Sequence, residues 1–108
     1  MAKFSDSKLP YTKQDALWDE FCEVISGLKK KDNVKRFLKD MLNRQERLML
    51  IRRLEIADML DANATYGEIT KQMGASSQTI ARVHRWLKFG RDGYRRAIVV
   101  RRSRKNKK

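Results

Sequence analysis

The chain has 108 residues, enough for one small domain, and its 26 Lys and Arg against 13 Asp and Glu give a formal net charge of +13. No apolar run approaches the roughly 20 residues of a membrane-spanning helix, and the N-terminus has no apolar signal core. A cytoplasmic protein without membrane contact is therefore expected. The single cysteine, Cys22, excludes an intramolecular disulfide and a cysteine-based metal site.

The positive charge is concentrated in the second part of the chain. Residues 1–62 hold 13 basic and 11 acidic side chains, whereas residues 63–108 hold 13 basic and only 2 acidic ones. Such segregation is typical of a surface that binds a polyanion. It favours double-stranded DNA as a partner over a membrane.

Residues 1–11 are expected to form an irregular N-terminal arm, followed by a helical domain over residues 12–100. Thr12 and Asp15 have the spacing of a capping box that would open the first helix. Apolar residues at three- and four-residue steps continue this helix to about Leu28, and a second helix follows the lysine run after it.

A third helix, opening near Asn43 and running to about Leu60, is apolar on most of its sides. A helix of this kind must be buried on most sides. The rest of the chain is too short to surround it, so a second copy is expected to supply the missing cover in an interlocked homodimer. The alternative is a monomer in which the first and second helices cover the third. The apolar residues are Leu48, Met49, Leu50, Ile51, Leu54, Ile56, Ala57, Met59 and Leu60.

Residues 65–88 have the spacing of a helix-turn-helix. Thr65 and Glu68 form a capping box at its start, and Gly74 can take a positive φ at the turn between the two helices. Ser76 opens the second helix, whose buried face is predicted by the repeat of Ile80, Val83 and Leu87. An αα-corner that binds nothing is the alternative to a DNA-binding unit.

The other face of this second helix is small and polar near its N-terminus and basic further along. A helix that enters a major groove needs such a face, since bulk there clashes and polar groups pair with base edges. His84, the only histidine, lies within this helix, where a phosphate contact or a solvent-facing position is expected. The sequence holds no catalytic nucleophile and base pair, no phosphate-binding glycine loop and no metal-ligand cluster. It therefore predicts neither an enzyme nor a cofactor.

Gly90 to Gly93 break the helix, and a short last helix is expected over residues 94–100. Residues 101–108 contain six basic residues and nothing apolar. They are expected to form a flexible basic tail that binds phosphates. The alternatives are a tail that serves only solubility and, in a host with a nucleus, a localisation signal.

Residues 40–60, and then the run Gly74-Ala-Ser-Ser-x-Thr-Ile-x-Arg-Val-x-Arg-x-Leu87 with Gly-x-x-Gly-Tyr at 90–94, resemble the Trp repressor family. The match is better to its small Trp-repressor-like branch of the YerC/YecD type. The resemblance covers about residues 15–98. It implies an all-α fold of about six helices, an intertwined homodimer, binding to palindromic operators and repression of transcription.

In the tryptophan-sensing members of that family, two arginines, a threonine and small residues form a pocket for the amino acid. The matching residues here are Arg53, Arg82 and Thr79. However, the family's glycine after the second arginine is Val83, and the serine that contacts the ligand's amino group is Trp86. Both add bulk to the pocket. The protein is therefore not expected to respond to tryptophan, and Trp86 is expected either to fill this space or to pack on the last helix.

By the same resemblance, Ser77, Gln78 and Ala81 face the base edges. Ser76, Thr79 and Lys88 are better placed for phosphates, and Arg85 adds affinity. Arg82 has two candidate roles, in the ligand pocket or at a phosphate. The expected DNA-binding residues are Ser76, Ser77, Gln78, Thr79, Ala81, Arg82, Arg85 and Lys88.

These observations favour a dimeric, sequence-specific DNA-binding regulator, a repressor by resemblance. A non-specific architectural protein that coats nucleic acid is the alternative, and the high net charge supports it. The lightly charged tip from Ser76 to Ala81 is the feature against it, because a coating protein would gain more from Lys or Arg there.

Overall fold

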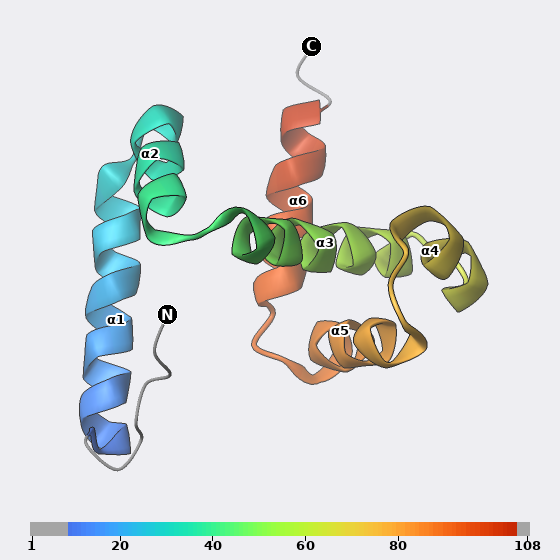
Figure 1. Ribbon diagram of the computed structural model, residues 1–108, viewed down its shortest axis with the longest axis horizontal. Helices are drawn as coiled ribbons and strands as arrows, with labels where there is room; N and C mark the ends of the chain where they lie inside the picture. Colours follow the sequence, from blue (N-terminus) through green and yellow to red (C-terminus); the bar gives the residue numbers. More distant parts are fainter. Residues whose placement is uncertain (1–8, 106–108) are drawn as a thin grey trace. The chain divides into compact units, whose positions relative to one another are not determined.

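The computed structural model of the chain describes residues 9–105, which form six α-helices and no strand (Figure 1). The predicted all-α class with a helix-turn-helix is confirmed. The helices are α1 (Tyr11–Leu28), α2 (Lys31–Met41), α3 (Arg44–Asp61), α4 (Tyr66–Met73), α5 (Ser77–Phe89) and α6 (Gly93–Lys105). The first two form one compact unit and the last four form another. In residues 9–105, no helix is long and apolar enough to cross a membrane.

In the first unit, α2 folds back on α1 and the two helices touch through aromatic rings. The ring centroids of Trp18 and Phe21 are 5.4 Å apart, and those of Phe21 and Phe37 are 6.0 Å apart. Neither helix contains a buried residue. Because apolar burial is the main source of helix packing energy, this unit gains little stability from burial within the single chain.

The start of α1 differs from the prediction. The helix begins at Tyr11, one residue earlier than expected, and Pro10 is its N-cap residue, with no side-chain capping bond. The capping box predicted at Thr12 and Asp15 is therefore wrong, and both residues lie inside the helix. Proline suits this position, because its fixed φ, here −57°, leads directly into a helix.

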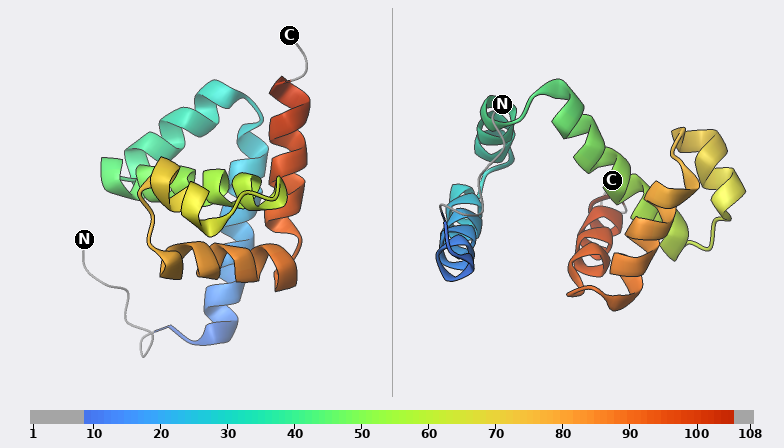
Figure 2. Two further views of the ribbon diagram at one scale, coloured as in Figure 1. Left: turned by 90° about the vertical axis from the view of Figure 1, so that its right-hand side faces the viewer. Right: turned by 60° about the horizontal axis from the view of Figure 1, so that its bottom comes forward.

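The second unit contains the hydrophobic core. Helix α3 packs against α4, α5 and α6, and Figure 2 shows α6 crossing it steeply. Each element contributes at least one apolar side chain to a single cluster. The buried residues are Ile56, Ala57, Ile69, Ala75, Ile80, Val83, Leu87 and Ile98.

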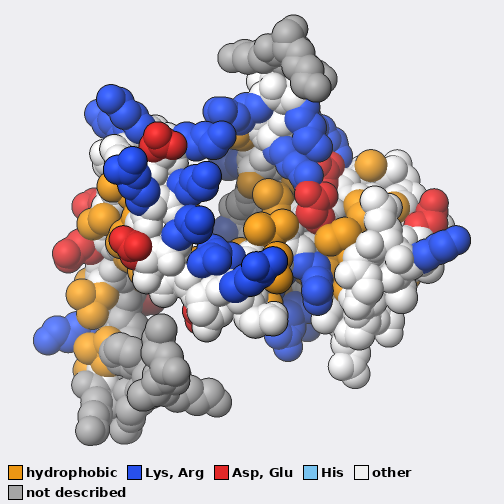
Figure 3. All heavy atoms as spheres, turned by 45° about the horizontal axis from the view of Figure 1, so that its top comes forward, with side chains coloured by type: hydrophobic (Ala, Val, Ile, Leu, Met, Phe, Trp, Pro, Cys, Tyr) orange, Lys and Arg blue, Asp and Glu red, His pale blue; other side chains and the backbone are white. Residues whose placement is uncertain are grey.

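Only the C-terminal half of α3 lies in this core. Its N-terminal half has four consecutive apolar residues, Leu48 to Ile51, with 42–55% of their surface exposed. Figure 3 shows apolar side chains open at the surface beside basic ones. The single chain therefore leaves uncovered the part of α3 that the sequence predicted to be buried.

The predicted boundary between the helical domain and the basic tail, at residue 100, is wrong. Residues 101–105 are not a tail but the last turns of α6, which ends at Lys105. Arg101 and Arg102 point back to α3 and form ion pairs with its acidic residues. Of the predicted tail, residues 106–108 lie outside the described residues, as do residues 1–8 of the predicted N-terminal arm.

Candidate nucleic-acid interface

The capping box predicted at the start of the helix-turn-helix is present. The Thr65 hydroxyl accepts a hydrogen bond from the Glu68 backbone N–H at 3.1 Å, and the Thr65 N–H donates to Glu68 Oε1 at 2.8 Å. The backbone hydrogen bond from Thr65, followed by that from its hydroxyl, lowers the pKa of the Glu68 carboxyl. Helix α4 is therefore fixed at its first turn.

The turn between the two helices follows the predicted geometry. Gly74 has a φ of 64° and a ψ of 22°, and its N–H donates to the Thr70 carbonyl. This left-handed conformation costs about 1–2 kcal/mol for a residue with a Cβ and almost nothing for glycine. Ala75 follows at 3% exposure in the core, so the turn itself is anchored.

Ser76 is the N-cap of α5, as predicted. Its hydroxyl accepts a hydrogen bond from the Thr79 backbone N–H at 3.2 Å and lies 3.1 Å from the Thr79 hydroxyl. The first turn of α5 thus has one of its free N–H groups satisfied by a short side chain, and its N-terminal tip stays narrow.

Successive residues of an α-helix are about 100° apart, and this spacing separates α5 into two faces. Ile80, Val83 and Leu87 form the buried face. Opposite them, one exposed arc carries small or polar residues near the N-terminus and basic residues further along. It holds Ser77, Gln78, Ala81, Arg82, Arg85 and Lys88. The structure thus brings the predicted DNA-binding residues onto one helix, with Ser76 at its cap and Thr79 half-buried at its edge.

His84 lies at the border of the buried face, where its Nδ1 is 2.9 Å from the Tyr66 hydroxyl oxygen. The two rings meet edge to face, with centroids 5.9 Å apart. The sequence analysis expected His84 to contact a phosphate or to face solvent, and it did not predict this pairing with Tyr66. The partner residues are 18 apart in the sequence, and only the turn at Gly74 brings them together.

A hollow of about 420 Å³ adjoins the exposed arc, between α3, α5 and α6. All five residues of the predicted ligand pocket line it. Trp86 forms part of the wall and is half-exposed, so it does not fill the space. The lining residues are Met49, Arg52, Arg53, Gln78, Thr79, Arg82, Val83, Trp86 and Tyr94.

Four of the lining residues were not predicted for the pocket: Gln78, which the sequence analysis assigned to DNA alone, and three that it did not single out. Met49 lies three residues before Arg52 and four before Arg53. This is the spacing of side chains on one face of a helix, so the position of Arg53 could have pointed to both. Tyr94 follows the Gly90 to Gly93 break and reaches the hollow from α6. The hollow thus combines three guanidinium groups with an indole, a phenol and a thioether. Within residues 9–105, no group of three metal-ligating side chains is present.

Comparison with known proteins places this geometry in a family. The model of the Trp repressor protein family matches residues 16–102. YerC of Bacillus subtilis (strain 168), an uncharacterised protein, is 39% identical over 80 residues, which are 74% of this chain and 77% of YerC.

Two solved structures are similar as well. A TrpR-like protein from Eubacterium eligens ATCC 27750 has a TM-score of 0.68 and 39% identity, covering 73% of this chain and 81% of its own. A candidate Trp repressor from Staphylococcus aureus has a TM-score of 0.70 and 30% identity, covering 94% of this chain and 96% of its own. The family match spans both units, and the chain therefore belongs to the Trp repressor family of DNA-binding regulators.

Proposed function

We propose that the protein is a sequence-specific transcriptional repressor that binds operator DNA as a homodimer, with α5 in the major groove. The observation that carries this proposal is the two-faced α5 helix. Its buried face fixes it to α3 and α4, while its exposed arc is small and polar at the tip and basic further along. A recognition helix has this distribution, because its N-terminal residues meet the base edges.

The exposed arc divides into residues that read bases and residues that bind phosphates. Ser77, Gln78 and Ala81 are proposed to face the base edges, and Gln78 can pair through its amide with adenine N6 and N7. Thr79 is half-buried, and its hydroxyl lies 3.1 Å from the Ser76 hydroxyl. Any phosphate contact of the Thr79 hydroxyl would therefore compete with this hydrogen bond at the helix cap.

The remaining DNA-binding residues are proposed to contact phosphates. Ser76 and Lys88 lie at opposite ends of α5, and Arg85 and Arg91 extend the positive surface around them. Arg82 lines the hollow and is also exposed, so it is within reach of either role.

The homodimer is supported by apolar surface that the single chain leaves open. Leu48 to Ile51 on α3 are exposed, as are Leu17 and Trp18 on α1, and neither α1 nor α2 has a buried residue. A second copy would cover these surfaces and present two α5 helices. The operator would then hold two half-sites about 34–36 Å apart.

The hollow is proposed not to serve tryptophan. Val83 and Trp86 add bulk at positions where the tryptophan-sensing members have glycine and serine, and the Trp86 indole forms part of the wall. Free tryptophan would have to share this space with an indole that belongs to the chain. An effector of another kind, or none, fits the arrangement better.

The experiment that tests the main proposal is selection of bound duplexes from a random DNA pool at near-physiological salt, followed by sequencing. A two-fold-symmetric motif is expected, and Gln78→Ala should lose preference at one position in each half-site. Binding without enrichment of any motif would reject sequence-specific regulation and support the architectural alternative, in which phosphate contacts provide all the affinity.

A further inference from the structure

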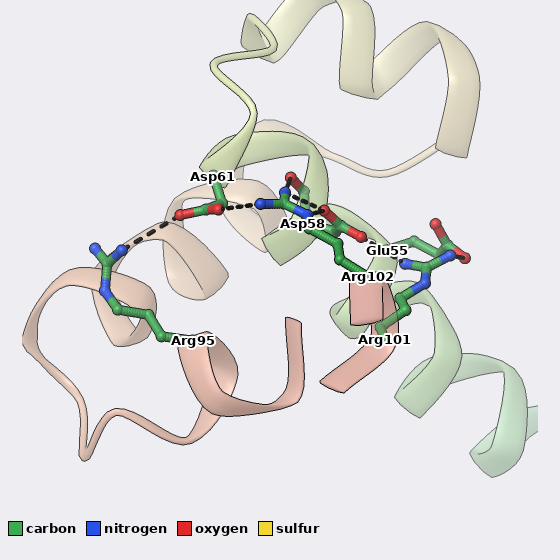
Figure 4. A network of polar contacts seen from close by, with 6 residues as sticks. All are labelled: Glu55, Asp58, Asp61, Arg95, Arg101 and Arg102. Atoms are coloured by element: carbon green, nitrogen blue, oxygen red, sulfur yellow. Dashed lines mark hydrogen bonds and ion pairs between the residues drawn. The ribbon is translucent and has the colours of Figure 1, made fainter. Parts of the chain in front are cut away.

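Helices α3 and α6 are joined by a network of opposite charges (Figure 4). Glu55, Asp58 and Asp61 are spaced three apart on α3, so their carboxylates lie along one face of the helix. Arginines of α6 extend toward that face. The network is named here the α3–α6 clamp, and its members are Glu55, Asp58, Asp61, Arg95, Arg101 and Arg102.

Arg102 has the most contacts in the clamp. Its Nε donates to Asp58 Oδ1 at 3.1 Å, its Nη1 donates to Asp61 Oδ2 at 2.8 Å, and its Nη2 donates to the Asp58 backbone carbonyl at 3.3 Å and to Asp58 Oδ1. All three guanidinium nitrogens are therefore directed at α3. The hydrogen bond with Asp58 raises the pKa of Arg102.

Arg101 and Arg95 complete the clamp on either side. Arg101 contacts Glu55 and donates through Nη1 to Asp58 Oδ2 at 3.2 Å, and its side chain is only 20% exposed. Arg95 reaches Asp61 Oδ1 at 3.3 Å from the other end of α6. Asp58 and Asp61 each bridge two arginines and are only 18% and 25% exposed, so solvent screens these pairs less than ordinary surface pairs.

Other basic residues on α6 are not held in this way. Arg96 is 82% exposed, and its one ion-pair partner among residues 9–105 is Asp92, one turn earlier. Arg104 is exposed and makes no ion pair with any residue from 9 to 105. Arg95 and Arg102 are themselves 50% and 44% exposed, so what distinguishes the clamp arginines from Arg96 and Arg104 is a carboxylate partner on α3.

We propose that the α3–α6 clamp withdraws Arg95, Arg101 and Arg102 from nucleic-acid phosphates and so limits non-specific DNA binding. This proposal rests on the proposed function, since it concerns the contrast between operator and other DNA. Affinity that is equal for all sequences does not help a regulator to discriminate its operator from the many competing sites. Three of the positive charges in the basic second part of the chain are neutralised locally by three carboxylates of α3.

The test is the salt dependence of binding to a duplex without operator sequence. Arg102→Gln and Arg104→Gln remove the same charge two residues apart on one helix. The slope of log K against log salt changes by about 0.9 for each phosphate contact. We expect Arg102→Gln to keep the wild-type slope and Arg104→Gln to lower it by about one contact.

Asp58→Asn tests the clamp from the other side, because it removes one ion-pair partner from each of two arginines, while Arg101 keeps Glu55 and Arg102 keeps Asp61. Because each arginine then has one carboxylate partner in place of two, we expect a steeper salt slope, by up to about one phosphate contact, and tighter binding to non-operator DNA. Asp92→Asn is the matched control: it changes the net charge equally but releases only Arg96, which is already exposed. It should leave the slope unchanged.

Several outcomes would overturn the proposal. It is wrong if Arg102→Gln lowers the slope by about one phosphate contact, or if Asp58→Asn behaves like Asp92→Asn. If Asp58→Asn does not fold, Arg95→Gln, which removes only one contact, replaces it and must keep the wild-type slope. If the wild type and every variant fail to bind duplex DNA, the proposed function itself is wrong; if they bind and only these contrasts fail, the clamp proposal alone is wrong.

Discussion

The Tyr66 hydroxyl lies 2.9 Å from Nδ1 of His84, and this hydrogen bond joins the first turn of α4 to the middle of α5. The two side chains also meet ring edge to ring face. Hydrophobic contacts are non-directional, whereas a hydrogen bond depends on its angle, so this pair adds a directional contact to the packing of α4 against α5. The pair thus connects the start of the helix-turn-helix to its proposed recognition helix.

Tyr66→Phe keeps the ring contact and removes only the hydroxyl. We expect the free energy of unfolding to fall by about 0.5–1.5 kcal/mol, the usual contribution of one hydrogen bond. Urea unfolding measures this, and His84→Ala provides the control background. If Tyr66→Phe costs as much in the His84→Ala variant as in the wild type, the hydrogen bond is not the source of the effect.

Gln78→Ala should weaken operator binding by about 1–3 kcal/mol and relax the base preference at one position per half-site. The reason is that its amide is the group on the α5 tip that can pair bidentately with a base. Binding assays on the selected operator and its single-base variants give the result. Gln45→Ala, an exposed glutamine on α3, is the control, and an equal loss in both variants would contradict a base-reading role.

Gly90→Ala should destabilise the fold by more than about 1 kcal/mol. A Cβ built at Gly90 lies 2.3 Å from the backbone carbonyl oxygen of Trp86, and backbone cannot move away as a flexible side chain does. Gly93→Ala is the matched control, since a Cβ there meets no atom within 4 Å and α6 begins at that residue. Thermal unfolding of the two variants should give opposite shifts, because alanine favours a helix over glycine.

The capping box makes stability depend on pH. The folded-state pKa of Glu68 is lowered, chiefly by the Thr65 backbone hydrogen bond, so its stabilisation is present above the unfolded-state pKa. That stabilisation is lost as the pH falls through the lower, folded-state pKa. Urea unfolding from pH 7 down to pH 2 should show the wild type losing its advantage over Glu68→Gln in acid. A constant difference between the two across this range would contradict the argument.

L-tryptophan should not bind with micromolar affinity. Val83 and Trp86 occupy the positions where the sensing members of the family have smaller residues, and both line the hollow. Isothermal titration calorimetry on the full chain tests this directly. Micromolar binding, with a matching increase in operator affinity, would show that the hollow is a working tryptophan site.

The sequence alone predicted most of the helix-turn-helix, because its determinants are local. Thr65 and Glu68 are three residues apart, Gly74 sits where φ is positive, and Ser76 caps the helix that it precedes. The buried positions of α5 follow from helical periodicity. The same reasoning failed at the start of α1, where Pro10 provides the entry to the helix and Thr12 does not cap it.

Only the tertiary structure shows that Arg101 and Arg102 are helical and form ion pairs with α3. Their composition predicts a basic tail. Their ion-pair partners Glu55, Asp58 and Asp61, however, lie 41 to 46 residues earlier in the chain. The packing of α6 across α3 brings these charges together, and both arginines lie within α6, which continues to Lys105. Local signals fix where a helix begins and which face it buries, whereas the pairing of distant charges depends on how the helices cross.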